Sequence, residues 1–157
     1  MKSIRIISLI IALVMICSVM ISCESGEVEV ILPERPFYDM TVSFQIKDGS
    51  GKTIFEAENY NYKGHEDPTI LNIISDYIKI VEEGRCTIDK NNTLQQVGGT
   101  KAKSGEYWAF MEGVNLDVQA ILTNPSLQKK HFIEDTRMAD YIVEDGGAFT
   151  IVLVKAS

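Results

Sequence analysis

The sequence predicts an α+β domain in which a mixed β-sheet packs on one main helix. Three segments of the 157-residue chain support this prediction: an alternating apolar segment at 40–47, an amphipathic segment at 67–84 and a β-branched run at 148–156. Alternation with a period of two is typical of a half-buried strand, whereas apolar residues spaced by three and four indicate a helix. A chain of this length is sufficient for one domain of ordinary size.

The first strand is predicted at 40–47, in the sequence MTVSFQIK, where apolar and polar residues alternate strictly. One face of this strand is therefore expected to be buried and the other to be solvated. Residues 48–51, Asp-Gly-Ser-Gly, form a turn signal, and KTIFEAE at 52–58 is predicted to return as the second strand of a hairpin. Residues 59–67 are predicted to form a loop.

The main helix is predicted to begin at Asp67 and to end at Gly84. Asp67 is a favourable N-cap, and Pro68 suits the first helical position, where its missing N–H costs no hydrogen bond. Gly84 is a typical helix stop. An apolar stripe with helical spacing lies between these ends and consists of Ile70, Ile74, Tyr77, Ile78 and Val81. The stripe predicts a helix of about 15 residues that covers one face of the sheet.

The second half of the chain is predicted to hold short strands and one long final strand. Short strands are expected at 85–90, 93–99 and 105–113, whereas 115–140 is expected to be an irregular connection with one or two helical turns. The run AFTIVLVKA at 148–156 is apolar on both faces, which is typical of a strand in the middle of a covered sheet. Together these elements favour a β-grasp-like arrangement, with the last strand parallel to the first. Composition alone does not distinguish this arrangement from other α+β sandwiches.

The first 22 residues are predicted to be an export signal rather than part of the fold. Lys2 and Arg5 precede an apolar run of about 16 residues, which is shorter than the roughly 20 residues needed to span a membrane. The run ends in Met-Ile-Ser-Cys at 20–23, which resembles a bacterial lipobox. The resemblance implies cleavage after Ser22 and attachment of a diacylglycerol to Cys23. Cleavage by the ordinary signal peptidase and an uncleaved anchor are the alternatives.

The chain is therefore divided into a lipoprotein signal peptide at 1–22, an acidic tether at 23–37 and one folded domain at 38–157. Removal of the signal leaves 13 basic and 22 acidic residues, a net charge of −9. Such an acidic surface disfavours nucleic acid as a partner. The expected location is extracytoplasmic and membrane-anchored, at the bacterial cell surface or the periplasmic face, with the membrane reached through the lipid.

Two motifs in the folded domain resemble those of a known family. GEYWAFMEGV at 105–114 and YIVEDGGAFTIVLV at 141–154 are similar to segments of the transcobalamin-like C-terminal β-grasp domain, also called domain-of-unknown-function family 4430. The order of elements over most of 38–157 agrees with that family, so the resemblance implies a β-grasp fold. In the vertebrate cobalamin carriers, this domain closes over one face of the corrinoid beside a helical barrel domain.

The resemblance also implies a set of ligand-binding candidates at the two motifs. They are Tyr107, Trp108, Phe110, Glu112, Gly113, Asp145 and Gly146. The chain departs from the family pattern where Glu112 replaces the usual turn asparagine and Gly147 replaces a second aspartate. Because this sequence shows no helical barrel partner, cobalamin binding does not follow from the resemblance, and no cofactor is predicted. A corrinoid or another small ligand remains an alternative.

The aromatic motif has a structural interpretation as well as a functional one. On a strand, Trp108 and Phe110 share one face, while Tyr107, Ala109 and Met111 share the other. Core packing explains most aromatic residues in such positions. The functional interpretation is a stacking platform for a ring-shaped ligand at the edge of the sheet, which requires Tyr107, Trp108 or Phe110 to be accessible.

Metal and thiol chemistry are only faintly indicated. His65, Glu66 and Asp67 are adjacent, but the second histidine of a zinc-protease motif is missing, and no metal site is predicted. Cys86 would be the single cysteine left after cleavage and acylation, and it is expected to be a half-buried structural thiol. A catalytic thiol would need a neighbouring base, for which the two histidines offer no recognisable pattern.

The sequence therefore predicts a non-catalytic, lipid-anchored module that presents its domain to a protein, glycan or small-molecule partner. One alternative is the capture of a corrinoid-like small molecule. The other is a hydrolase of envelope material that uses the carboxylate pairs Glu134–Asp135 and Glu144–Asp145. General acid–base chemistry would require two such carboxylates to face each other across a cleft, roughly 5–10 Å apart in glycosidases.

Overall fold

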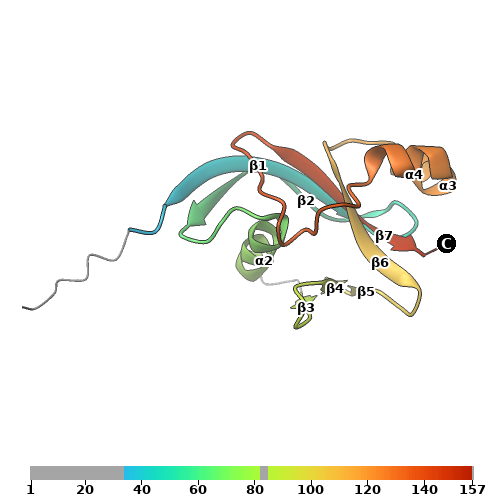
Figure 1. Cartoon of the computed structure of the whole chain (residues 1–157), viewed down its shortest axis with the longest axis horizontal. Helices are drawn as coiled ribbons and strands as arrows, with labels where there is room; N and C mark the ends of the chain where they lie inside the picture. Colours follow the sequence, from blue (N-terminus) through green and yellow to red (C-terminus); the bar gives the residue numbers. More distant parts are fainter. Residues whose placement is uncertain (1–33, 82–84, 157) are drawn as a thin grey trace, which may run out of the picture. The chain divides into compact units, whose positions relative to one another are not determined.

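A computed structural model describes residues 34–81 and 85–156 of the chain (Figure 1). Contacts divide the chain into the units 1–34 and 35–157, and the fold below is that of the second unit. Its elements are, in order, β1 (Tyr38–Lys47), β2 (Thr53–Gly64), α2 (Ile70–Ile80), β3 (Cys86–Ile88), β4 (Leu94–Val97), β5 (Thr100–Lys101), β6 (Glu106–Glu112), α3 (Val118–Thr123), α4 (Pro125–His131) and β7 (Ala148–Lys155). The predicted signal peptide, Cys23 and most of the predicted tether lie outside the described residues.

The main sheet has four strands in the order β2-β1-β7-β6. β1 pairs in parallel with β7, in a register that aligns Phe44 with Phe149 and Ile46 with Ile151, whereas β2 and β6 are antiparallel to their neighbours. The central strand β7 carries six consecutive buried residues from Phe149 to Val154. The predicted α+β class, the parallel pairing of the first and last strands and the central position of the last strand are confirmed.

The second strand is longer than the sequence predicts. Residues 59–67 were expected to form a loop, but β2 continues through Gly64. The physical reason is a bulge at Asn59, whose positive φ of 52° shifts the register and allows the strand to continue. After the bulge, Tyr60 and Tyr62 pair with β1, and the Tyr62 side chain is buried.

The main helix begins later than predicted. Its N-cap is Thr69, whose side chain accepts a hydrogen bond from the Asn72 N–H at 3.2 Å, so the prediction of Asp67 as the cap is wrong. The chain makes a tight turn at 67–69, in which the Thr69 N–H bonds to the Asp67 carbonyl at 2.7 Å. The Asp67 carboxylate instead accepts a hydrogen bond from the Tyr38 hydroxyl at 2.8 Å.

The helix buries five apolar side chains. Its buried residues are Ile70, Leu71, Ile73, Ile74 and Ile78. The helix ends at Ile80 with Val81 as its C-cap, and the predicted stop at Gly84 lies outside the described residues. No helix in the described parts of the chain is long and apolar enough to cross a membrane.

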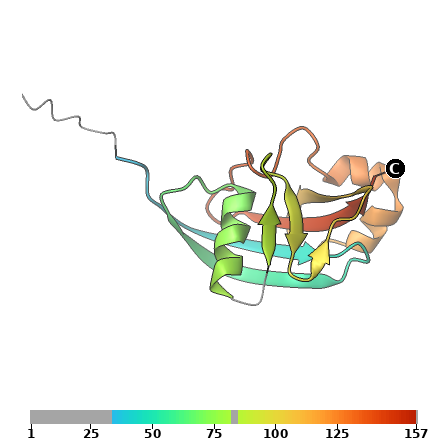
Figure 2. The same cartoon turned by 90° about the horizontal axis from the view of Figure 1, so that it is seen from below.

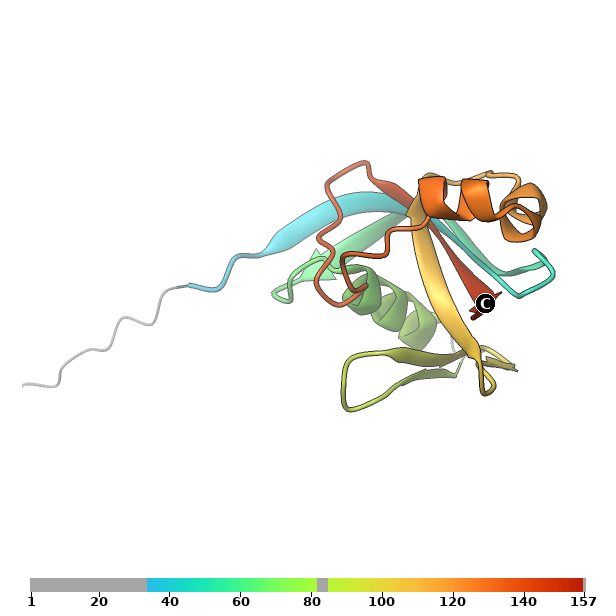
Figure 3. The same ribbon diagram turned by 45° about the vertical axis from the view of Figure 1, so that its right-hand side comes forward.

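The two faces of the main sheet are covered by different layers. Figure 2 shows α2 and the three-stranded sheet β3-β4-β5 on the same face of the main sheet. Figure 3 shows α3 and α4 on the opposite face, where Val118, Ile121 and Phe132 pack with Met111 and Val154. The segment 115–140, expected to hold one or two helical turns, therefore forms two short helices that cover the β6–β7 half of the sheet.

Candidate functional site

The aromatic motif lies on β6 with the alternation that the sequence predicts. Trp108 and Phe110 belong to the core on the α2 face, whereas Ala109 and Met111 pack under α3 and α4. Trp108 and Phe110 are only 7% and 3% exposed, but Tyr107 is 44% exposed. The structural interpretation therefore holds for two of the aromatic side chains, and the third one remains accessible.

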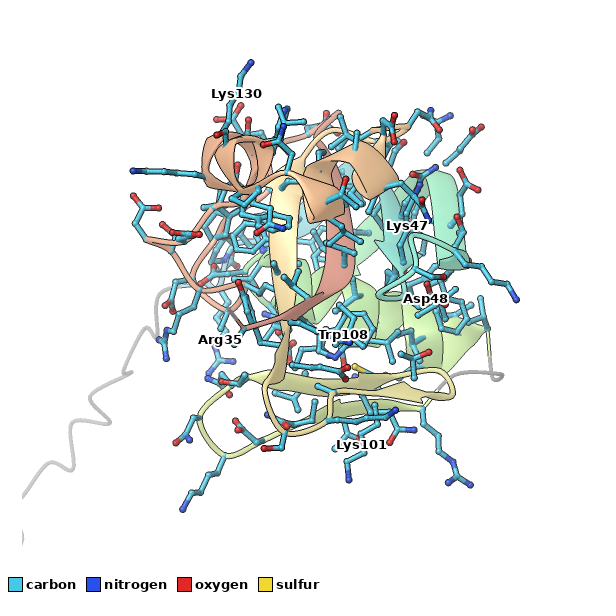
Figure 4. The ribbon with its side chains drawn as sticks, turned by 90° about the vertical axis from the view of Figure 1, so that its right-hand side faces the viewer. Arg35, Lys47, Asp48, Lys101, Trp108 and Lys130 are labelled. Atoms are coloured by element: carbon cyan, nitrogen blue, oxygen red, sulfur yellow. The ribbon has the colours of Figure 1, made fainter. Side chains whose placement is uncertain are left out.

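A cavity of about 380 Å³ lies along the outer edge of β6. β6 is the last strand of the main sheet, so only β7 pairs with it. Besides 107–110 of β6, the wall is formed by two other segments, 92–94 at the start of β4 and all residues of 132–138 after α4 except Asp135. Figure 4 shows Trp108 between the main sheet and the three-stranded sheet, close to this edge.

The interior of the cavity is apolar, and its rim is polar. The apolar lining residues are Leu94, Trp108, Ala109, Phe110, Phe132, Ile133 and Met138. The rim is supplied by Asn92, Thr93, Glu134, Thr136 and Arg137, of which Arg137 forms a bidentate ion pair with Asp140. An apolar cavity with a few convergent polar groups is the usual form of a small-ligand or peptide site.

The segment after α4 is fastened to the edge of β6 at two points. The Ile133 N–H donates to the Phe110 carbonyl at 3.0 Å. Further along, the Tyr141 ring meets the Phe110 ring edge-on at 5.2 Å between centroids, and its hydroxyl donates to the Glu112 carboxylate. The hydrogen bond to Glu112 and the burial of the ring raise the pKa of Tyr141 to about 12. These contacts hold the outer wall of the cavity in place.

The opposite wall is set by a tight turn between β3 and β4. The Asp89 carboxylate accepts hydrogen bonds from the backbone N–H groups of Asn91 at 2.8 Å and Thr93 at 3.0 Å. Asn92 has a positive φ of 58°, which asparagine tolerates better than most residues. This turn places Thr93 and Leu94 beside β6, and the Asp-Lys-Asn-Asn pattern was the available sequence signal for it.

The indole nitrogen of Trp108 is buried without a hydrogen-bond acceptor among the described residues. Leaving a buried donor unpaired costs about 1–3 kcal/mol. Trp108 is therefore held in place by packing against its apolar neighbours rather than by a polar contact.

The predicted candidates at the turns do not join the aromatic residues in one site. Glu112 and Gly113 line a second cavity of about 490 Å³, together with Tyr141 and the chain around 142–149. Asp145 and Gly146 have a structural use, because the Asp145 carboxylate accepts a hydrogen bond from the Thr41 N–H at 2.8 Å. The Gly146 N–H donates to the Thr41 carbonyl at the same distance.

The sequence reasoning missed part of the cavity wall. Phe132, Ile133 and Met138 line it, yet they belong to the segment that the sequence describes least clearly. Their apolar character within a polar stretch was the only available signal. Their position next to β6 depends on tertiary contacts, because Phe132 packs under α3 and α4, whereas Ile133 and Met138 pack with the core on the α2 face.

The adjacent His65, Glu66 and Asp67 do not form a metal site in the structure. The described residues contain no group of three or more His, Cys, Asp or Glu side chains that could hold a metal ion. The His65 ring packs edge-on against Phe37 at 5.1 Å. Asp67 is engaged by the Tyr38 hydroxyl, as described above.

The two carboxylate pairs lie at different places. Glu134 is at the rim of the β6 cavity, and Glu144 lines the second cavity. Their neighbours do not line these cavities, and Asp145 is bound to the backbone of β1. Neither of these two cavities is lined by carboxylates from both pairs, which is the arrangement that a two-carboxylate hydrolase built from them would need.

Cys86 lies at the start of β3 and is half-buried. Burial raises the pKa of its thiol above the ordinary value, and the nearby Lys79 opposes this effect only in part. A raised pKa leaves little thiolate at neutral pH, so Cys86 has the character of a structural residue.

Comparison with known proteins gives a fold but no family. No family model matches the chain, and no curated protein sequence matches it. Among solved structures, the chain is similar to haptocorrin, a transcobalamin-like protein, in complex with Cbi, with a TM-score of 0.52 and 12% identity. The match covers 76% of this chain and 26% of haptocorrin.

A second solved structure is a candidate metal-binding protein from Ruminococcus gnavus. Its TM-score is 0.42 at 12% identity, with 75% of this chain and 99% of that chain covered. That similarity is too low to carry an argument. The likeness to haptocorrin supports a transcobalamin-like fold for this chain.

Proposed function

We propose that the protein is a non-catalytic binding module, anchored by a lipid on the extracytoplasmic face of a bacterial membrane, and that it binds its partner in the β6 cavity. The observation that carries the proposal is the apolar cavity at the edge of β6, in the middle of the aromatic motif. The buried rings of Trp108 and Phe110 line the cavity, and Tyr107 adds an accessible aromatic surface.

The anchoring part of the proposal rests on the N-terminal sequence. Lys2 and Arg5, the apolar run and the lipobox-like Met20–Cys23 support a lipoprotein signal. Metabolic labelling with an alkyne fatty acid tests this directly. We expect label on the full-length protein and on Cys17→Ser, and no label on Cys23→Ser. Label retained by Cys23→Ser would contradict the assignment.

A second candidate function is the capture of a corrinoid-like small molecule. The fold likeness to haptocorrin, which was solved with Cbi, favours this candidate, as do the two motifs that resemble the transcobalamin-like family 4430. In this reading, a flat ring system would stack on Tyr107 and enter the cavity beside Trp108.

The intrinsic fluorescence of Trp108 tests both candidates, because Trp108 is the single tryptophan of the chain. Full-length protein in detergent micelles is titrated with cobinamide, haem and soluble cell-wall fragments. If the cavity binds one of them, emission changes saturably, and Tyr107→Ala weakens the binding about tenfold or more. Phe37→Ala is the matched control, because Phe37 is 59% exposed and does not line the cavity.

The outcomes separate the candidates. Binding of cobinamide that Tyr107→Ala weakens supports corrinoid capture in this cavity. Binding that both variants retain places the ligand elsewhere and contradicts the proposed site. If no compound changes the emission, the small-molecule candidate fails, and a macromolecular partner remains as the proposal.

A further inference from the structure

The backbone of β6 presents every second residue to the cavity side. Gly113 N–H bonds to the Ala148 carbonyl, and Ala156 N–H bonds to the Gly105 carbonyl, so both ends of the β6–β7 ladder are fixed. The register between them is continuous, without a bulge. Because backbone groups alternate in direction along an antiparallel pair, the odd-numbered residues of β6 bond to β7. The N–H and C=O groups of the even-numbered residues point outward.

Two of these outward groups already have partners from the same chain. The Phe110 carbonyl accepts from Ile133 N–H at 3.0 Å, and the Glu106 N–H donates to the Lys103 carbonyl at 2.9 Å. The Trp108 N–H, the Trp108 C=O and the Phe110 N–H have no such partner in the described part of the chain. Both residues line the cavity, so these three groups lie at its inner wall.

The contact from Ile133 shows what kind of group this edge accepts. The residue that pairs there belongs to a segment without helix or strand, and it pairs through its main chain. A second extended segment that continues along the same edge would meet the three unpaired groups around Trp108. At about 3.3 Å per residue, an extended segment of about five residues would run alongside β6 from Glu106 to Phe110.

The charges around the cavity favour an uncharged occupant. The lining contains one acidic residue, Glu134, and one basic residue, Arg137, whose guanidinium is already paired with Asp140 at 2.6 Å. Inside this rim the wall is apolar. A charged group that entered this apolar interior would lose hydration without an ionic partner there, whereas an uncharged peptide segment would complement both the wall and the backbone groups.

We propose that the occupant of the β6 cavity is an extended, uncharged peptide segment of a partner protein, which adds to the main sheet as a strand beside β6. This inference rests on the proposed function and names the partner class for that site. Main-chain hydrogen bonds to Trp108 and Phe110 supply affinity. Alternate apolar side chains of the segment enter the cavity between Leu94 and Met138 and supply specificity.

The test uses full-length protein in detergent micelles and, as probe, a phage-displayed library of random uncharged decapeptides. Thr93→Trp serves for counter-selection, because Thr93 is exposed at the cavity rim and a bulky ring there obstructs the mouth. Thr87→Trp is the matched control, since Thr87 is exposed on the same small sheet but does not line the cavity. An enriched peptide is then synthesised in two forms, each N-methylated at alternate amides.

We expect the peptide to bind the native protein and Thr87→Trp, and to bind Thr93→Trp about tenfold or more weakly. One N-methylated form should bind about tenfold more weakly than the unmodified peptide, and the other should bind with the same affinity as the unmodified peptide. The reason is that a strand bonds through alternate residues. Hydrogen exchange of the Trp108 and Phe110 amides should slow in the complex. Equal affinity of both N-methylated forms, or unchanged exchange at these amides, would overturn the strand addition.

The failure of this inference differs from the failure of the proposed function. If no peptide is enriched but a compound of the fluorescence panel binds beside Tyr107, the peptide inference is overturned and the binding site stands. If neither a peptide nor a compound binds, both are overturned.

Discussion

The two edge strands of the main sheet, β2 and β6, differ in the features that keep their unpaired backbone groups from pairing with another strand. β2 has 12 residues, a bulge at Asn59 and charged side chains at Glu56, Glu58 and Lys63. β6 has seven residues, and the five between Glu106 and Glu112 are uncharged. Charges and bulges are the usual means of preventing edge-to-edge association. The comparison indicates that β2 is protected against pairing with another strand. The edge of β6 is open to such pairing where the chain's own residues 132–138 do not cover it.

The protection of β2 extends to its main chain. The Glu56 carbonyl accepts a hydrogen bond from the Tyr77 hydroxyl of α2 at 3.2 Å. The Glu56 carboxylate is in turn bonded by the buried amide of Gln45 at 2.6 Å. No equivalent side chain reaches the three unpaired groups of Trp108 and Phe110 among the described residues. The two edges therefore differ in the hydrogen bonds that side chains make to their main chain, as well as in length.

The largest expected effect compares one phenylalanine from each edge. Phe110→Ala should cost about 3–5 kcal/mol of unfolding free energy, because the Phe110 ring is almost fully buried in the core. Phe55→Ala on β2 should cost clearly less, because Phe55 is only partly buried. Urea denaturation of both variants and the native protein measures the difference.

The two variants control for each other, since both remove the same atoms from an edge strand. Equal losses would mean that the β6 edge is not tied more firmly to the core than the β2 edge. An unchanged denaturant slope is required for the comparison, because a change in slope would signal a different unfolded or folded state.

The next effect concerns the bulge that sets β2 apart. Asn59 has a φ of 52° and an exposed side chain. Asn59→Ala should destabilise the protein by about 1–2 kcal/mol, because the Cβ of alanine lies too close to the backbone in the left-handed conformation. Asn59→Gly should leave the stability nearly unchanged, because glycine has no Cβ to clash. If alanine and glycine have the same effect, the bulge does not depend on this conformation.

Most of the fold could be predicted from local pattern. The alternation in β1, the apolar stripe of α2 and the buried run of β7 each reflect a periodicity that burial imposes on the chain. The prediction failed where a single residue changes the geometry. The bulge at Asn59 extended β2 into a predicted loop, and the turn at 67–69 moved the helix cap from Asp67 to Thr69.

The candidate site was predicted only in part. The aromatic motif identified β6, because its alternation and the family resemblance fall on the same residues. The outer wall of the cavity could not be predicted, because Ile133 and Met138 reach β6 through tertiary contacts with the core on the α2 face. Asp145 and Gly146 were predicted as ligand contacts, but the structure shows them bonded to the backbone of Thr41.

A smaller effect is expected at the fastening of the β6 wall. Tyr141→Phe removes the hydrogen bond to Glu112 and should cost about 0.5–1 kcal/mol at pH 8, the lower part of the usual range because the pair is exposed. The raised pKa of Tyr141, about 12, means that the folded state holds this proton more tightly than the unfolded state does. The stabilisation is therefore complete below about pH 10 and is lost as the pH rises toward 12.

Urea midpoints at pH 8 and pH 11 check this dependence. The stability difference between native protein and Tyr141→Phe should narrow at the higher pH. The other tyrosines are present in both proteins, so their titration cancels in the difference. A gap that stays constant between the two pH values would contradict the pH dependence. No gap at either pH would show that Tyr141 contributes by packing on Phe110 alone, since phenylalanine keeps that ring.

The smallest effect on stability is expected from the charges of β2. Lys63 forms an ion pair with Asp39 at 2.8 Å, but the two side chains are 54% and 51% exposed. Such a pair contributes little, so Lys63→Thr should change the unfolding free energy by less than about 0.5 kcal/mol. Combined with Glu58→Thr, it should nevertheless increase self-association, measured by light scattering, because Glu56 is then the single charge left on β2. If the double variant stays monomeric at high concentration, the bulge at Asn59 and Glu56 are sufficient to prevent pairing at this edge.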